Sequence, residues 1–271
     1  MAEVLVITSG KGGVGKTTST AALGAALAQT GQSVVVVDFD IGLRNLDLAL
    51  GAECRVVYDL INVANGDVRL QQALIRDERL DTLYLLAASQ SRDKDALSEG
   101  GVQRCIDELR DKFDWVICDS PAGIERGATL AMRFADRAVV VTNPEVSSVR
   151  DSDRIIGLLD SKTVKAEKGE RMDKLLLLTR YDSAQAGRRH MLSIDDVLDI
   201  LSLPLIGIIP ESQEILRASN VGAPITIADA QSTPACAYRD AARRLRGETV
   251  PMIIPGGRKN LLNRLFGRRA A

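Results

Sequence analysis

The sequence has a single histidine and only four cysteines among its 271 residues. One histidine, His190, cannot supply a metal centre built from several imidazoles, and its isolation disfavours histidine acid–base catalysis. The cysteines form no C-x-x-C pair, which argues against zinc-ribbon, paired-cysteine iron–sulfur and disulfide-framework proteins. Any chemistry therefore rests on carboxylates, lysines, a metal ion or the backbone, in a chain whose thiols we expect to be reduced and mostly buried.

Long apolar runs are also missing. The longest, residues 21–28 and 203–209, fall far short of the ~20 residues that a membrane-spanning helix needs. Glycines from Gly10 onward interrupt the chain before the apolar core of a signal peptide develops, so we expect a cytoplasmic protein. The formal net charge is −1 and 45% of the residues are apolar, which is an ordinary globular composition.

Short apolar runs alternate along the chain with segments of helical periodicity. Continuous runs typical of buried strands cover residues 4–8, 34–38, 83–88, 115–119, 138–142, 175–179 and 205–209. Helical patterns cover residues 17–30, 102–112, 148–161, 194–201 and 233–245. This alternation predicts an α/β fold, with a mostly parallel twisted sheet and helices on both faces.

The pattern predicts three segments. Residues 1–247 form one domain, because neither internal repeats nor a long linker divide them. Residues 248–257 form a spacer that contains Pro251, Pro255, Gly256 and Gly257, which are hostile to helices. Residues 258–271 form a basic and apolar tail.

A glycine-rich loop follows the first predicted strand and opens the first predicted helix. Residues 10–18 read G-K-G-G-V-G-K-T-T, which matches the phosphate-binding pattern G-x-x-x-x-G-K-[ST] in its required context. Glycines let successive N–H groups converge on an anion at a helix N-terminus. The expected nucleotide contacts are Lys11, Gly12, Gly13, Val14, Gly15, Lys16, Thr17 and Thr18. Lys16 would bind the β- and γ-phosphates of ATP, and the Thr17 hydroxyl would bind Mg²⁺.

Acidic residues end two predicted strands. Asp38 and Asp40 follow one strand, and Asp119 ends another. Ligands collect at the carboxyl ends of parallel strands, so these carboxylates should lie near the phosphate loop and its Mg²⁺. For any one of them alone, a helix cap or turn is an equally good reading.

Lys11 is an unusual residue within the loop. A lysine directly after the first glycine resembles the deviant P-loop ATPases, in which it crosses a dimer interface to the partner's nucleotide. From the residues alone, Lys11 could equally be a surface lysine that raises the local positive potential.

Further motifs make the resemblance more specific. They are D-F-D-I-G-L-R-N-L-D at residues 38–47, C-D-S-P-A-G-I-E at 118–125 and T-N-P-E-V-S-S-V-R-D-S-D at 142–153. Over essentially its whole length the chain resembles the ParA/MinD family, and within it the septum-site-determining MinD ATPases of bacteria. The resemblance implies slow, partner-stimulated hydrolysis by a dimer. It assigns catalysis to Lys11, Lys16 and Asp40, with Asp40 positioning the attacking water. Asp38 and Asp119 join Thr17 in the magnesium shell, the carboxylates through water.

Base and partner contacts are likewise implied by the resemblance. Arg180, Pro210 and Glu211 flank the adenine, although each is also an ordinary loop residue. ATP-driven dimers bind the inner membrane from the cytoplasm, reversibly, and recruit the division inhibitor MinC until MinE stimulates their release. The surface shared by MinC and MinE corresponds to Glu145, Ser147, Arg150, Asp151 and Asp153. Capping of a helix explains the aspartates equally well.

The tail has the pattern of a membrane-surface helix. It carries five basic residues and no acidic ones. At ~100° per residue, one arc gathers its large apolar side chains, Leu261, Leu262, Leu265 and Phe266. Ordering the segment offsets most of the gain from burial, so one tail should bind anionic lipid weakly, while two tails on a dimer gain ~10²–10⁴-fold in avidity. A helix packed on its own domain, or a frayed end, is the alternative.

Two other functions fit the phosphate loop. A ParA-like DNA-partitioning ATPase would need a basic face on the folded domain, whereas the clear basic cluster lies in the tail, so we expect no specific nucleic acid partner. A metabolic P-loop kinase or synthetase would need a second substrate site, for which no signature is visible.

Overall fold

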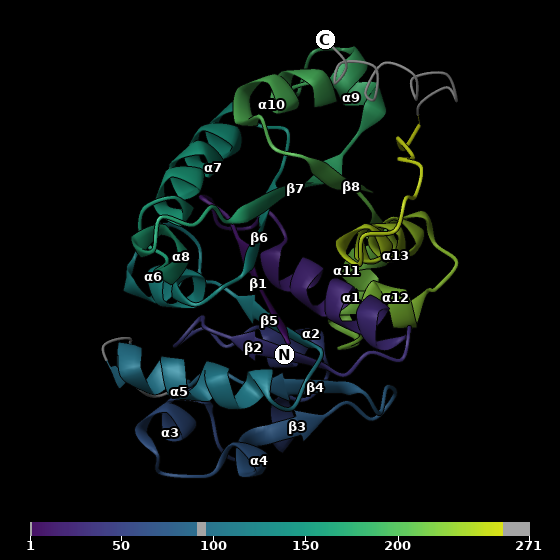
Figure 1. Cartoon of the computed structure of the whole chain (residues 1–271). Coiled ribbons are helices and arrows are strands. Elements are labelled where there is room, and N and C mark those ends of the chain that lie inside the picture. Colours follow the sequence, from purple (N-terminus) through teal and green to yellow (C-terminus); the bar gives the residue numbers. More distant parts are fainter. Residues whose placement is uncertain (1, 91–95, 257–271) are drawn as a thin grey trace.

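The computed structural model describes residues 2–90 and 96–256 and is built around an eight-stranded sheet (Figure 1). The strands lie in the order β3-β4-β2-β5-β1-β6-β7-β8. Their bounds are β1 Glu3–Thr8, β2 Val34–Asp38, β3 Leu74–Arg76, β4 Leu83–Leu86, β5 Trp115–Asp119, β6 Arg137–Thr142, β7 Asp173–Tyr181 and β8 Leu205–Pro210. Every neighbouring pair is parallel except β3 and β4. The predicted α/β fold with a mostly parallel sheet is confirmed.

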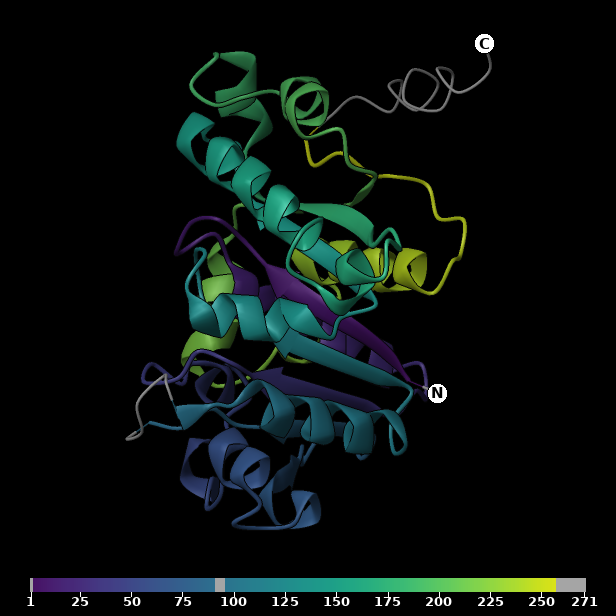
Figure 2. The same ribbon diagram turned by 60° about the vertical axis from the view of Figure 1, so that its left-hand side comes forward.

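Helices cover both faces of this sheet (Figure 2). Their bounds are α1 Lys16–Ala28, α2 Leu46–Ala49, α3 Leu60–Asn65, α4 Leu70–Ala73, α5 Glu99–Arg110, α6 Arg126–Arg133, α7 Val146–Leu159, α8 Val164–Glu167, α9 Ser183–Gly187, α10 Ile194–Leu201, α11 Gln213–Asn220, α12 Ile225–Ala228 and α13 Thr233–Leu245, with a 3₁₀ turn at Glu53–Arg55. Along each strand, successive side chains point to opposite faces of the sheet and pack against different helices. Leu5 and Ile7 pack under α1 and α13, whereas Val4 and Val6 pack under α5, α6 and α7.

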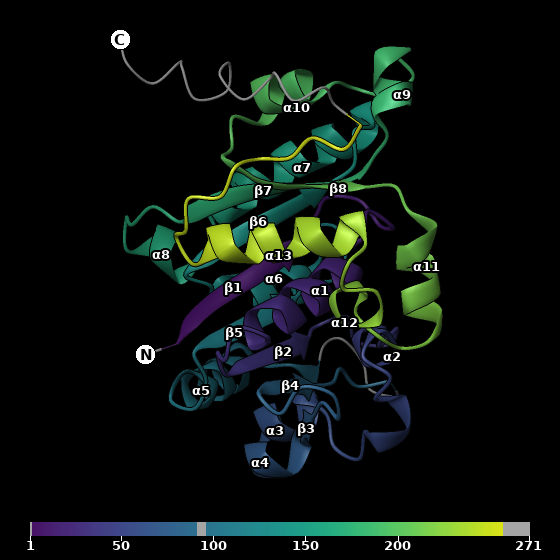
Figure 3. The same ribbon diagram turned by 90° about the vertical axis from the view of Figure 1, so that its right-hand side faces the viewer.

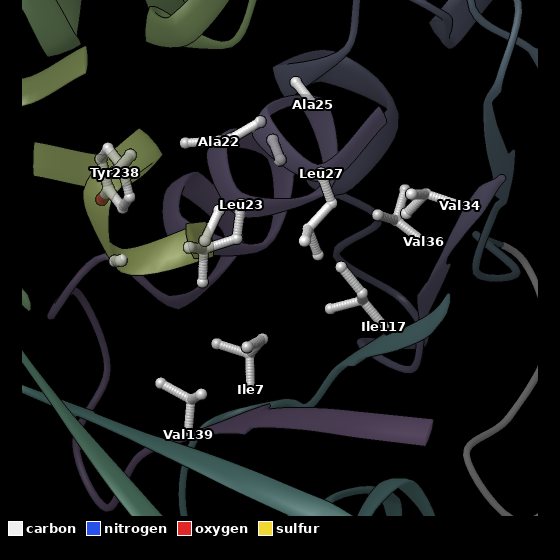
Figure 4. Packing of buried hydrophobic residues seen from close by; sticks show 14 of the residues in the cluster. Ile7, Ala22, Leu23, Ala25, Leu27, Val34, Val36, Ile117, Val139 and Tyr238 are labelled. Carbon is white, nitrogen blue, oxygen red and sulfur yellow. The ribbon is translucent and has the colours of Figure 1, made fainter. Parts of the chain in front are cut away.

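The helix that follows the phosphate loop lies unusually close to the sheet (Figure 4). α1 is rich in alanine, and a side chain added at Gly24 would come within 2.7 Å of Val36 Cγ1. Small residues let the helix backbone approach the strands, and Leu27 faces Val36 and Ile117 while Leu23 faces Ile7 of β1 (Figure 4). This packing fixes the N-terminus of α1, which is where the phosphate loop ends.

The region between β2 and β4 holds elements that the sequence analysis did not predict. Residues 46–76 hold three short helices, a 3₁₀ turn and β3, which runs antiparallel to β4. Helices of four to six residues and a strand of three are too short to show a clear period. Their positions depend on tertiary contacts that a periodicity argument does not detect.

The predicted spacer lies against the domain over its described part, residues 248–256, which we call the strap. Arg244 of α13 holds its first half, because its guanidinium donates to the carbonyl oxygens of Val250 at 3.0 Å and Pro251 at 2.6 Å. The same group donates to the Ile206 carbonyl at 2.7 Å, on the edge strand β8. The strap is therefore fastened to both α13 and the exposed edge of the sheet.

The second half of the strap returns to the carboxyl ends of the strands (Figure 3). Met252 and Ile254 pack against the cluster that joins β7 and β8 to α10. Gly256 lies so close to α9 that an added side chain would come within 2.1 Å of Ser183 Oγ. The predicted membrane segment, residues 258–271, lies outside the described residues.

Candidate nucleotide site

The phosphate loop occupies the turn between β1 and α1. Gly13 and Gly15 have φ angles of 74° and 95°, in the left-handed region that glycine adopts without a steric penalty. Gly15 is the N-cap of α1. Gly10 is pressed against α7, since an added Cβ would lie 2.2 Å from the Asp151 carbonyl carbon. The loop glycines thus serve both a tight turn and a close contact with α7.

Lys16 is buried, with 8% of its surface exposed, at the first position of α1. Its ammonium donates to Ser9 Oγ at 2.9 Å. Burial lowers the pKa of Lys16, although Asp119 and Asp40 oppose that shift. Such an ammonium, poorly solvated and placed at a helix N-terminus, is suited to binding a phosphate.

Two carboxylates lie side by side because their strands are in register. Asp38 of β2 pairs directly with Asp119 of β5, and both are almost fully buried. Burial raises the pKa of Asp119 to about 6, while hydrogen bonds from Thr17 and Thr20 and the charge of Lys16 oppose the rise. Burial, together with the neighbouring Asp119, raises the pKa of Asp38 well above its usual value. The sheet therefore holds two acids that favour a positive charge beside them.

The two aspartates after β2 have different positions. Asp38 faces inward and accepts hydrogen bonds from the backbone N–H groups of Asp40, at 2.8 Å, and Leu46, at 3.2 Å. It thereby fixes the loop that leads to α2. The strand has ended at Asp38, so Asp40 lies beyond it and lines the cleft beside the phosphate loop.

A cleft of about 600 Å³ extends from the phosphate loop along the carboxyl ends of the strands. It brings together the predicted residues Gly12, Gly13, Gly15, Lys16, Thr17, Thr18, Asp40 and Arg180. Val14 is buried beneath the loop, and its carbonyl accepts a hydrogen bond from Thr179 Oγ1 at 2.7 Å. Pro210 and Glu211 do not line the cleft, although Glu211 lies 4.0 Å from Arg180.

A larger and more open hollow of about 1140 Å³ lies at the opposite ends of the strands. Two of the cations that line it already have acidic partners, because Arg110 pairs with Asp136 at 2.6 Å and Arg137 with Glu3 at 2.7 Å. Open parallel sheets bind ligands at the carboxyl ends of their strands. The cleft at the phosphate loop is therefore the candidate nucleotide site.

Magnesium fits this site with few protein ligands. The Thr17 hydroxyl donates to buried Asp119 at the head of the loop, so an oxygen pair is already assembled there. Within residues 2–90 and 96–256, no group of three or more histidine, cysteine or acidic side chains could hold a metal. An ion here would take its other ligands from phosphates and water, which is how Mg²⁺ commonly binds.

Lys11 makes a contact within its own chain. Its ammonium lies 2.7 Å from Glu145 Oε2 and 3.1 Å from Ser147 Oγ. Contact with Lys11 lowers the pKa of Glu145. The phosphate loop is thus joined to the start of α7, where Arg150 and Asp153 are exposed and Asp151 is partly covered by the loop.

Comparison with known proteins places the chain in a family. Residues 5–225 match the CobQ/CobB/MinD/ParA nucleotide binding domain. Over 270 residues, 98% of this chain and all of the relative, it is 56% identical to the septum site-determining protein MinD of Escherichia coli K12. The chain belongs to the MinD family. The resemblance deduced from its motifs is confirmed, and the protein is a P-loop ATPase that uses ATP and Mg²⁺.

Solved members of the MinD family share this architecture. The MinC:MinD cell division complex of Aquifex aeolicus superposes with a TM-score of 0.84 at 43% identity, covering 93% of this chain and 99% of that one. MinD of Pyrococcus horikoshii, solved with Mg-ADP, gives 0.80 at 30% identity, covering 90% and 96%. No helix in the described part of this chain is long and apolar enough to cross a bilayer.

Sequence reasoning missed the residues that hold the site in place. Ser9 anchors Lys16, Thr20 donates to Asp119 at 3.0 Å, and Thr179 supports the loop backbone. Each is a small hydroxyl residue, Thr20 within α1, Thr179 within β7 and Ser9 just after β1. The partners of Thr20 and Thr179 are far away in sequence, and the partner of Ser9 is brought to it by the loop. The one available signal was a polar residue in an otherwise buried run.

Substitution of Asp119 should separate stability from function. Asp119→Asn removes a carboxylate whose folded pKa lies above its unfolded value, so ionisation of the wild-type group opposes folding as pH rises. We expect the nucleotide-free variant to be more stable than wild type by roughly 1–3 kcal/mol at pH 8. This gain in stability should shrink as pH falls from about 6 toward 4. At every pH, the variant should lose Mg²⁺-dependent hydrolysis.

Denaturant unfolding at several pH values measures this effect. Asp107→Asn, on the exposed side of α5, is the control and should change little. A variant that is less stable than wild type at pH 8 would contradict the charge argument.

Proposed function

We propose that the protein is an ATP-driven dimerising switch that acts in placing the division septum. In this proposal the ATP-bound dimer binds the cytoplasmic membrane surface through its tails and recruits a MinC inhibitor. A MinE partner then stimulates hydrolysis and releases it. The observation that carries the proposal is the contact of Lys11 with Glu145 and Ser147, because it joins the nucleotide loop to the surface expected to bind partners.

Hydrolysis would depend on residues that line the cleft. Lys16, already desolvated, would bind the β- and γ-phosphates, and backbone N–H groups from Gly12 to Gly15 would surround them. Asp40 would hold the attacking water in line with the γ-phosphate. Bound Mg²⁺, held by Thr17 and through water by Asp38 and Asp119, would neutralise phosphate charge.

Removing the Asp40 carboxylate tests this assignment. Asp40→Ala should bind ATP and dimerise as wild type does but lose at least ~100-fold in turnover, the range of one acid–base or positioning group. Turnover, nucleotide affinity and sedimentation in ATP would be measured on one preparation. Undiminished hydrolysis would exclude Asp40 from the reaction.

Dimerisation would require Lys11 to leave its own Glu145. Both side chains are partly exposed, at 39% and 54%, and surface ion pairs of this kind contribute only about 0–1 kcal/mol. The triphosphate bound to the partner subunit carries more negative charge than one carboxylate. The transfer of Lys11 from Glu145 to that triphosphate should therefore be favourable. Departure of Lys11 would also free the side chains of Glu145 and Ser147 at the start of α7. The nearby surface formed by Arg150, Asp151 and Asp153 would change as a result.

Two variants separate the role of Lys11 from its resting contact. Lys11→Ala should abolish ATP-dependent dimerisation, because no other side chain replaces the cross-subunit charge. Glu145→Gln removes the resting ion pair but keeps the lysine, so it should dimerise at equal or lower ATP. Sedimentation with ATP and with ADP measures both. Lys11→Ala dimers that form at wild-type ATP would refute the role of Lys11.

Membrane binding is assigned to Leu261, Leu262, Leu265 and Phe266 of the tail. Avidity from two tails makes the dimer the membrane-bound form without any change in the tail itself. A chain that ends at Gly256 retains the strap and should keep slow hydrolysis but no longer sediment with anionic vesicles in ATP. If it still sedimented with the vesicles, the anchor would lie elsewhere.

A further inference from the structure

Two threonines near the start of α1 contact the same carboxylate, that of Asp119. Thr17 and Thr20 are three residues apart, a spacing that places side chains on one face of a helix. Thr20 Oγ1 donates to Asp119 Oδ1 at 3.0 Å, and the Thr17 hydroxyl also donates to Asp119. The last residue of β5 is therefore joined twice to the beginning of the helix that follows the phosphate loop.

The two threonines differ in their access to the nucleotide cleft. Thr17 lines the cleft and is partly exposed. Thr20 is fully buried and is not among the residues that line the cleft. A magnesium ion in the cleft could therefore bind the Thr17 hydroxyl, whereas Thr20 could act on that ion only through Asp119.

The neighbouring carboxylate, Asp38, is held in another way. Its two oxygens accept from the backbone N–H groups of Asp40 and Leu46. The Asp119 carboxylate instead accepts from the two threonine side chains. Because Thr20 lies outside the cleft, its bond to Asp119 does not depend on whether Thr17 binds a metal. Without Thr20, a buried carboxylate oxygen would lose a hydrogen bond that no water could easily replace.

We propose that Thr20 is a positioning residue that raises the affinity of the nucleotide site for Mg²⁺ by fixing the orientation of the Asp119 carboxylate. The inference rests on the proposed place of Asp119 in the magnesium shell. Groups that orient the residues around a metal typically contribute 10–100-fold to its affinity. Binding of nucleotide without metal would not depend on Thr20, since Thr20 does not touch the cleft.

Substitutions on α1 separate this role from a general effect on packing. Thr20→Val keeps the shape of the side chain and removes the hydroxyl, whereas Thr20→Ser keeps the hydroxyl. Ser19→Ala is the matched control. Ser19 is the adjacent residue and equally buried, but its hydroxyl shares a hydrogen bond with Tyr238 at 3.0 Å instead of with Asp119.

Magnesium affinity would be measured by calorimetric titration of Mg²⁺ into the complex of the full-length chain with ADP. We expect Thr20→Val to need about tenfold more Mg²⁺ for half-saturation. Its ADP affinity in EDTA should stay within twofold of wild type. In steady-state hydrolysis, the KM for Mg²⁺ should rise by a similar factor while kcat at saturating Mg²⁺ falls less than threefold. Thr20→Ser and Ser19→Ala should match wild type within twofold in the Mg²⁺ titration.

Three outcomes would overturn the proposal. Wild-type magnesium affinity in Thr20→Val would show that the Thr20 hydroxyl does not serve the metal. An equal loss of ADP affinity in EDTA would indicate a general defect of α1. A tenfold loss of magnesium affinity in Ser19→Ala would show that any buried hydrogen bond of α1 has the same effect. Thr20→Ala would take the place of the valine variant if that variant did not fold.

Asp119→Asn in the same titration distinguishes this inference from the proposed function. If Asp119→Asn loses magnesium affinity and Thr20→Val does not, only the role of Thr20 is refuted. If Asp119→Asn binds Mg²⁺ as wild type does, the proposed place of Asp119 in the magnesium shell is refuted, and the role of Thr20 with it.

Discussion

The parallel register of β2, β5 and β1 is the constraint on which the site depends. It places Asp38 beside Asp119 and brings both to the level at which β1 gives way to the phosphate loop. Two buried acids together are unfavourable unless a cation lies near them. Lys16 supplies one charge and bound Mg²⁺ would supply more. The two acids therefore carry an electrostatic cost that a bound cation would relieve.

Three glycines allow elements of the fold to pack closely against one another. Gly10 against Asp151, Gly24 against Val36 and Gly51 against Gly222 each leave no room for a side chain. The first joins the phosphate loop to α7, the second seats α1 on the sheet, and the third brings the ends of α2 and α11 together. The first and third contacts are made to backbone atoms, whereas the second is made to the Val36 side chain.

Much of this could be read from the sequence, and the reasons for the gaps are physical. Long valine and leucine runs have one plausible environment, so β1, β2 and β5 through β8 were predicted almost residue for residue. The loop glycines and Lys16 could be predicted because they match the spacing of the phosphate-binding motif, and Asp119 because it ends an apolar strand. The roles of Thr20 and Thr179 depend on partners up to 165 residues away, and that of Ser9 depends on how the loop turns. Elements of three to six residues, such as β3 and α2, have no period to detect.

The strap has a geometric consequence for whatever follows it. α13 ends beside the amino-terminal ends of the strands, where Leu245 contacts Arg137. Eleven further residues, which reach at most about 40 Å, bring the chain to Ser183 just after the end of β7. The polypeptide is thus returned to the side of the molecule where the phosphate loop lies. Anything attached after Gly256 begins its path a short distance from Arg180 instead of at the remote end of the sheet.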